Sequence, residues 1–154
     1  MTYIILITAL FLDGIISTIV SENSYFIPHI LLTTLFMIYP KYKNNLSTYN
    51  AILIITGIIY DLLYTNLLFF HGVIFFVIGK LIKYLRQNYS QRLLINIFLL
   101  VIVITSYILL ISICLLFFRT TSITIANILN FIQKSLFLNI LYLLLFNPII
   151  KNKV

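Results

Sequence analysis

Three ionisable side chains lie inside long apolar stretches of the sequence, where they could do chemistry. Asp13 lies in the first stretch, Asp61 in the third, and Lys134 near the middle of the sixth. A charge inside a membrane-spanning helix costs ~2.5–3.5 kcal/mol on insertion scales, so each needs a partner or a cavity. We therefore expect Lys134 to pair with Asp13 or Asp61. The functional alternative is a proton or ion relay, but relays usually use a run of carboxylates or histidines, and this sequence offers two membrane acids.

Gly57 and Asp61 are four residues apart and so lie on one face of a helix, with Ile58 and Tyr60 to the sides. A glycine lets a neighbouring backbone come close. Two interpretations stay open for this face: ordinary helix packing, or a specific site near the outer surface.

Several carboxamide side chains lie in apolar stretches, most of them in the sixth. Asn127, Asn130 and Lys134 follow i, i+3, i+7 spacing and form a polar stripe on one helix face. We expect the stripe to face the interior of a helix bundle rather than lipid. Such groups hydrogen-bond between helices for a modest ~0.6 kcal/mol each. The carboxamides expected to do so are Asn96, Asn127, Asn130, Gln133 and Asn139.

Metal-binding and catalytic patterns are absent from the sequence. His29 and His71 have no further ligands at suitable spacing, so each is expected to be an interfacial hydrogen-bonding residue. The single cysteine, Cys114, allows no disulfide framework. No Ser-His-Asp or Cys-His set, intramembrane pair of catalytic carboxylates or glycine-rich phosphate loop can be named. We expect no metal, no cofactor and no enzymatic activity.

Composition identifies the elements that must position these residues. Of 154 residues, 62% are hydrophobic and 8% charged, against roughly 45–50% and 25% in soluble domains. The mean hydropathy is +1.15. A bilayer span needs ~20 apolar residues, so six spans would use nearly the whole chain. The sequence predicts a single integral membrane domain over residues 1–154.

The predicted fold is all-α, a polytopic bundle of six transmembrane helices. The spans are expected at about residues 2–20, 25–39, 49–64, 67–84, 93–118 and 123–146. The first apolar stretch lacks a preceding basic region, so we expect a retained helix and not a signal peptide. Pro148 is expected to end the sixth helix before a basic tail.

The formal net charge of +7 indicates topology and not nucleic-acid binding, because the basic residues lie between apolar stretches. Lysine and arginine mark the cytoplasmic side. If the N-terminus is cytoplasmic, Arg119 alone lies outside and Lys134 lies within a span. We therefore expect both termini in the cytoplasm. The residues then on or next to the cytoplasmic face are Lys41, Lys43, Lys80, Lys83, Arg86, Arg92, Lys151 and Lys153.

Residues 57–68, Gly-Ile-Ile-Tyr-Asp-Leu-Leu-Tyr-Thr-Asn-Leu-Leu, resemble the central signature of the MreD family of bacterial rod shape-determining membrane proteins. In that family the motif marks the third span and the turn into the fourth. Residues 27–32 resemble its entry to the second span, and Asn139 falls where a sixth-span Asn is usual. The family commonly has Gly directly after the two Leu, whereas here Phe69-Phe70-His71 come before Gly72. His29 stands where Asn or Asp is more usual.

The resemblance implies a non-enzymatic component of the rod complex in the bacterial plasma membrane. Such a protein supports lateral peptidoglycan synthesis together with MreC, the actin-like MreB, RodA and a class B penicillin-binding protein. An outer pocket near Asp13, Asp61 and Lys134 would then stabilise the bundle or receive a segment of a partner.

The main alternative is the substrate-binding component of an energy-coupling factor vitamin transporter, also a small six-helix bundle. Such components often dock to the coupling subunit through Ala-x-x-x-Ala in the first span. Here that register gives Ala9 and Asp13, and residues 21–24 make a short outer loop. A membrane-embedded enzyme ranks last, because no catalytic set can be named.

Overall fold

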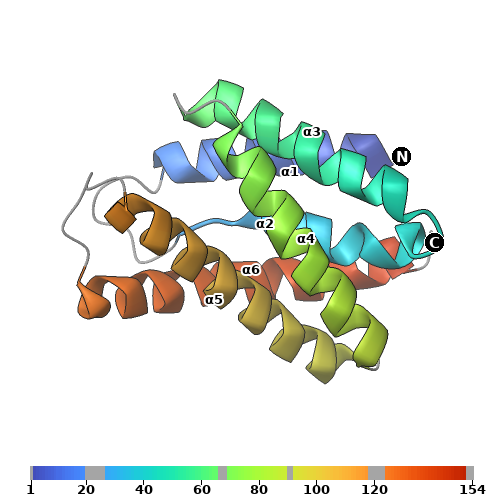
Figure 1. The fold of residues 1–154 in the computed structure, drawn as a ribbon. Helices are drawn as coiled ribbons and strands as arrows, with labels where there is room; N and C mark the ends of the chain where they lie inside the picture. Colours follow the sequence, from blue (N-terminus) through green and yellow to red (C-terminus); the bar gives the residue numbers. More distant parts are fainter. Residues whose placement is uncertain (1, 20–26, 66–68, 90–91, 118–123, 152–154) are drawn as a thin grey trace.

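The computed structural model describes residues 2–19, 27–65, 69–89, 92–117 and 124–151, the last five by their backbone alone. All regular structure in these residues is helical, so the predicted all-α class is confirmed (Figure 1). Four of the helices, α1, α3, α5 and α6, are long and apolar enough to cross a membrane. The elements are α1 Thr2–Ile19, α2 Ile30–Ile38, the 3-10 helix η1 Tyr39–Tyr42, α3 Leu46–Tyr64, α4 Phe70–Asn88, α5 Leu93–Phe117 and α6 Ile125–Lys151.

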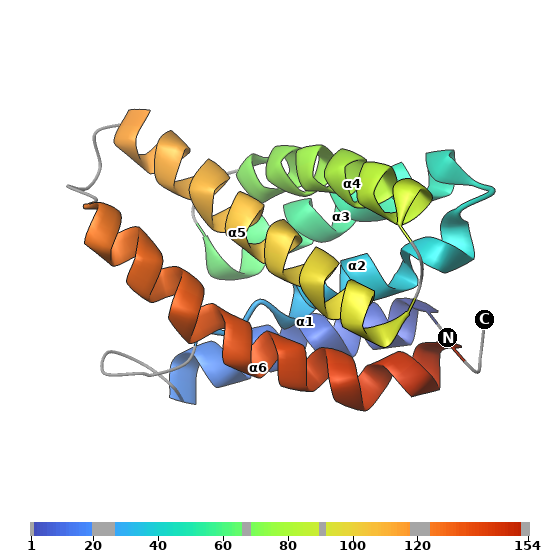
Figure 2. The ribbon, with the colours of Figure 1, turned by 90° about the horizontal axis from the view of Figure 1, so that it is seen from below.

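The second element differs most from its prediction. A continuous helix over residues 25–39 is wrong, because residues 27–29 have no regular structure and α2 begins at Ile30. Pro28 disfavours helical geometry at Ile27, and His29, with φ −139° and ψ 47°, is the non-helical residue before α2. All nine residues of α2 are buried, and the helix contacts α1, α4, α5 and α6. This short helix, ~14 Å long, lies at the centre of the bundle (Figure 2).

Other helix boundaries shift by a few residues. α3 begins at Leu46, where the Asn45 side chain accepts a hydrogen bond from the Thr48 N–H at 3.2 Å. α4 starts at Phe70 and extends beyond the predicted residue 84 to Asn88. α6 continues through Pro148 to Lys151, so the expected stop before the tail is wrong. Pro148 lies within the last turn, where its missing N–H removes a single hydrogen bond. The predicted loops at residues 21–24 and 119–122 lie outside the described residues.

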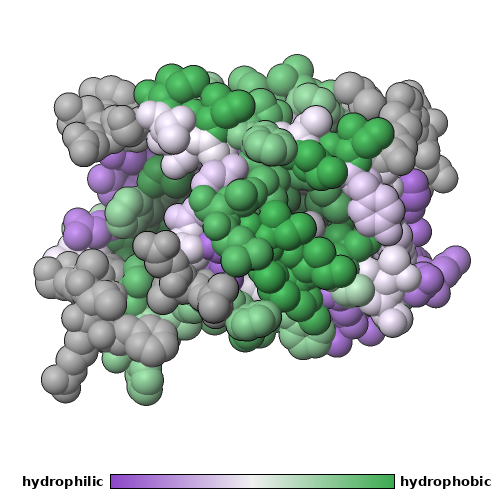
Figure 3. All heavy atoms as spheres, turned by 90° about the horizontal axis from the view of Figure 1, so that it is seen from above, coloured by the Kyte–Doolittle hydropathy of each residue, from purple (hydrophilic) through white to green (hydrophobic). Residues whose placement is uncertain are grey.

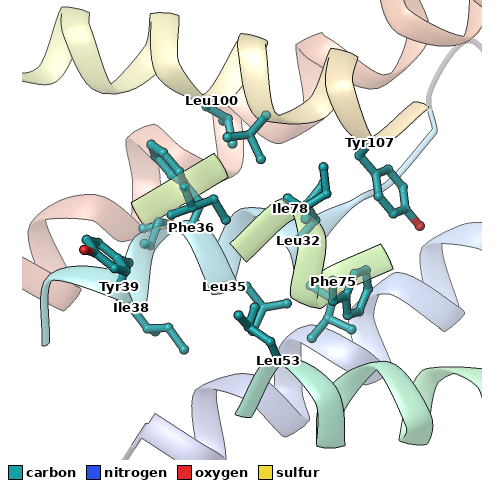
Figure 4. Packing of buried hydrophobic residues seen from close by; sticks show 14 of the residues in the cluster. Leu32, Leu35, Phe36, Ile38, Tyr39, Leu53, Phe75, Ile78, Leu100 and Tyr107 are labelled. Atoms are coloured by element: carbon teal, nitrogen blue, oxygen red, sulfur yellow. The ribbon is translucent and has the colours of Figure 1, made fainter. Parts of the chain in front are cut away.

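The helices pair mainly as α3 with α4, α1 with α2 and α5 with α6. The start of α1 and the end of α6 lie at the same end of the bundle, at the right of Figure 1. The core is built around α2, whose Leu35 and Phe36 meet Leu53, Ile78 and Leu100 from neighbouring helices (Figure 4). Apolar residues cover most of the middle of the face in Figure 3, and hydrophilic residues gather toward its ends.

Candidate functional site

The buried carboxylate of Asp13 caps the N-terminus of α2. Its Oδ1 accepts a hydrogen bond from the Ile30 N–H at 2.7 Å, and its Oδ2 accepts one from the Leu31 N–H at 3.2 Å. The first N–H groups of a helix have no partner within it, and the helix dipole favours negative charge at that end. Asp13 therefore fastens α1 to the start of the central helix.

Asp61 does the same for α4. Its Oδ2 accepts a hydrogen bond from the His71 N–H at 2.8 Å, while its Oδ1 lies 2.5 Å from Nδ1 of the His71 ring. Thr65 Oγ1 also donates to Oδ1, at 2.8 Å. Phe69, just before α4, has the left-handed backbone φ of 65°, a conformation that favours glycine. The Asp61 carboxylate thus links the end of α3 to the start of α4.

The predicted ion pair of Lys134 with Asp13 or Asp61 is wrong. Among the described residues, the basic side chain within ion-pair distance of either carboxylate is that of His71, whose Nδ1 contacts Asp61 Oδ1. Lys134 contributes its backbone instead, because its carbonyl accepts a hydrogen bond from the Ile27 N–H at 3.2 Å. Both carboxylates are satisfied by N–H groups at helix starts, which replace the cation that the sequence suggested.

Asn139 completes the bonding of the irregular segment before α2. Its Oδ1 accepts hydrogen bonds from the His29 N–H at 3.2 Å and the Thr33 hydroxyl at 3.0 Å. Its Nδ2 donates to the carbonyls of Ile27 at 3.5 Å and Ser135 at 2.7 Å. Irregular backbone at membrane depth is tolerated only where protein groups or water satisfy it. The predicted interhelical bonding of Asn139 is therefore confirmed, with backbone as its main partner.

Gly57 is used for close packing. A Cβ added there would lie 2.5 Å from both Cα and N of Gly72 on α4. On the same helix, the Tyr60 ring packs against the rings of Tyr64 and His71, with centroids 5.1 and 4.7 Å away. The hydroxyl of Tyr64 donates to the Leu10 carbonyl on α1 at 2.9 Å. In this part of α3, Gly57 thus allows close helix packing, and Tyr60 and Tyr64 contribute aromatic rings.

These rings line a partly open cavity of about 360 Å³. Its walls come from α1, the segment before α2, α3, the start of α4 and the second half of α5. Of the lining residues, the sequence indicates Asp13 and Tyr60 as site candidates, whereas no sequence pattern indicates a binding role for His29, His71 or Tyr107. Two sequence features could have indicated this cavity. They are the tyrosines at positions 60 and 64, and the small or polar residues Gly14, Ser17 and Thr18 that follow Asp13 in α1. The lining residues are Asp13, Gly14, Ser17, Thr18, His29, Tyr60, Tyr64, Thr65, His71, Tyr107 and Ile111.

Lys134 and Asn139 are not among the lining residues, and Asp61 stands behind His71. A second, mostly apolar cavity of about 230 Å³ is lined by α5, the segment before α2 and Phe131 of α6, and His29, Tyr107 and Ile111 line both cavities. The two rings pack edge to face with centroids 5.0 Å apart. Both rings therefore belong to the wall that the two cavities share.

The polar stripe on α6 does not face the bundle interior. Asn127, Asn130 and Gln133 are exposed, and Lys134 is half-buried. The buried polar side chains of this helix are Ser135 and Asn139, farther along. The prediction is wrong because the first turns of α6 have few neighbours; their side chains are almost all exposed.

At the opposite end of α4, Arg86 is buried although it was predicted to mark a cytoplasmic surface. Its guanidinium lies 3.9 Å from the centroid of the Phe36 ring, and Nη1 donates to Asn96 Oδ1 at 2.7 Å. The predicted interhelical role of Asn96 is confirmed by this bond. The arginine links α4 to α2 and α5.

Within the described residues, no group of three or more His, Cys, Asp and Glu side chains could hold a metal ion. Comparisons with family models, with curated proteins and with solved structures found no match for the chain.

Proposed function

We propose that the protein is a non-enzymatic component of the rod complex of the MreD type. In this proposal it lies in the bacterial plasma membrane with six spans and both termini in the cytoplasm. It supports lateral peptidoglycan synthesis by binding MreC and, with it, RodA, a class B penicillin-binding protein and MreB.

One observation carries the proposal of partner binding: the exposed carboxamides of α6. Asn127, Asn130 and Gln133 face outward in the first half of residues 125–146, which are apolar enough to cross a membrane. Lipid offers such groups no hydrogen bonds, whereas a neighbouring transmembrane helix can. A partner helix against this stripe would satisfy them.

Phe69 supports the family resemblance. The MreD family commonly has glycine directly after the two Leu of its signature, which is the position of Phe69. This residue has the positive φ that glycine adopts without strain. Phe69 thus replaces the family's glycine at a position whose backbone conformation favours glycine.

The arrangement of the helices is compatible with cytoplasmic termini. α1 begins and α6 ends at one end of the bundle, where η1 also leads into α3 (Figure 1). Lys41 and Lys43 lie at that end, in and just after η1. Basic residues favour the cytoplasmic side.

A pull-down in mild detergent from native membranes, followed by mass spectrometry, tests the proposal. We expect MreC, RodA or a penicillin-binding protein with the wild type, and their loss from the triple variant Asn127→Leu, Asn130→Leu, Gln133→Leu. The matched control is the triple variant Ile7→Leu, Phe11→Leu, Ile15→Leu, which changes exposed apolar residues of α1. Recovery of an ATPase pair with a transmembrane coupling subunit would overturn the proposal.

The cavity favours the second candidate, the substrate-binding component of a vitamin transporter. Its volume of about 360 Å³ falls within the range of small-molecule sites. Against this candidate, Ala9 is fully buried and Asp13 is 6% exposed. The face that would dock to a coupling subunit is therefore packed inside the bundle.

A further inference from the structure

We propose that the cavity beside Asp13 binds an organic cation, an alkylammonium or guanidinium group. The inference does not depend on partner binding through α6, since none of the exposed carboxamides of α6 lines this cavity.

The charge of the lining favours a cation. Among the described residues the walls include one carboxylate, Asp13, and no lysine or arginine. A second carboxylate, Asp61, lies directly behind the His71 ring. Among the described residues, the lining and the side chain directly behind it thus supply two carboxylates and no lysine or arginine.

An anionic ligand is disfavoured although two helices begin at this cavity. Helix N-termini attract anions through free N–H groups. At the start of α2 the N–H groups of Ile30 and Leu31 already bond Asp13, and at the start of α4 the N–H of His71 bonds Asp61. Asp13 and Asp61 therefore already bond the N–H groups that could bind an anion at these two helix starts.

Besides Asp13, five aromatic side chains line the cavity. The rings of Tyr64, Tyr60, His71, Tyr107 and His29 follow one another around the wall, with successive centroids 5.1, 4.7, 6.4 and 5.0 Å apart. Tyr107 also borders the apolar core (Figure 4). Aromatic faces attract cations, more strongly in a site removed from water. A carboxylate beside several rings is the chemistry that recognises alkylammonium groups.

Two sources could supply such a group: a small quaternary ammonium compound, or a lysine or arginine side chain of another protein. Choline serves as the probe for the first source, and n-butylammonium and n-butylguanidinium serve for the second. The neutral analogue 3,3-dimethylbutan-1-ol has nearly the shape of choline without its charge. Binding is measured by calorimetry on the full-length protein in detergent.

We expect at least one of the three cations to bind at least about tenfold more tightly than 3,3-dimethylbutan-1-ol, because the aromatic rings and the carboxylate both attract positive charge. Tighter binding of choline would identify a small quaternary ammonium compound, and tighter binding of the butyl probes would identify a lysine or arginine side chain. Absence of binding by all three cations, or equal binding of the neutral analogue, would overturn the proposal.

Variants locate the site. Because Asp13 also caps α2, the principal variant is Tyr60→Leu, which removes a ring and leaves both caps in place; affinity should fall at least about fivefold. Tyr60→Phe, which keeps the ring, should retain most of it. Tyr84→Leu, an exposed position on α4 that does not line the cavity, is the control. Unchanged affinity in Tyr60→Leu would contradict the proposed site.

Discussion

Gly57 on α3 and Gly72 on α4 pack backbone against backbone, with no room for a side chain at Gly57. A Cβ there would lie 2.5 Å from Gly72 and 2.6 Å from the His71 carbonyl carbon. The α3–α4 pair is the most extensive helix contact of the bundle. This one glycine therefore sets how closely the two helices approach.

Gly57→Ala should destabilise the protein by roughly 1–3 kcal/mol, because overpacking forces the backbones apart. Gly72→Ala is the matched control, since a Cβ there would meet its nearest neighbour at 3.4 Å, an ordinary contact. Thermal unfolding can be followed with a thiol-reactive dye at Cys114, the only cysteine of the chain. Equal melting temperatures for the two variants would contradict this packing.

Phe69→Gly should stabilise the protein by up to about 1 kcal/mol. The left-handed conformation costs ~1–2 kcal/mol for a residue with a side chain, which exceeds the entropy that glycine adds to the unfolded chain. The Phe69 ring is 60% exposed, so little packing is lost. Phe70→Gly, inside the first turn of α4, should instead lower the melting temperature. A lower melting temperature for Phe69→Gly would refute the strain argument.

Asn139→Leu should destabilise the bundle by about 1–3 kcal/mol, because buried backbone groups lose their partners. Hydrogen–deuterium exchange should become faster at the His29 N–H, because in the wild type this group donates a hydrogen bond to Asn139 Oδ1. Asn130→Leu serves as the control, since Asn130 is exposed on the same helix. Unaltered exchange at His29 would show that this bond does not hold the segment.

Lys134→Met should change the stability of the purified protein by no more than about 0.5 kcal/mol. The structure pairs both buried carboxylates with N–H groups and leaves the lysine ammonium outside these contacts. The side chain of methionine has a similar length and is apolar, and the backbone bond to Ile27 is unaffected. A loss of several kcal/mol would contradict this arrangement and support the ion pair that the sequence suggested.

The helical class and most helix positions could be predicted, because runs of apolar residues specify a spanning helix without reference to their neighbours. α5, predicted at residues 93–118 and found at Leu93–Phe117, is the plainest case. The six-span count and the cytoplasmic termini stay predictions.

Partners could not be predicted in the same way, because they depend on which helices meet. Asp13 was recognised as a group that needs a partner, but both a distant lysine and a nearby helix start could supply one. The choice depends on where α2 begins, since the N–H groups of Ile30 and Leu31 lie in its first turn and are free to bond Asp13. Exposure of Asn127 and Asn130 depends likewise on where the other helices lie.

The bond between Asn139 and His29 joins positions 110 residues apart, which sets an order for biogenesis. When the ribosome has made α1 and α2, the acceptor for the His29 N–H and the donor to the Ile27 carbonyl have not yet been synthesised. The polar backbone before α2 must then stay with water or the insertion machinery until α6 emerges. The central helix is thus among the first to be translated and among the last to find its final place.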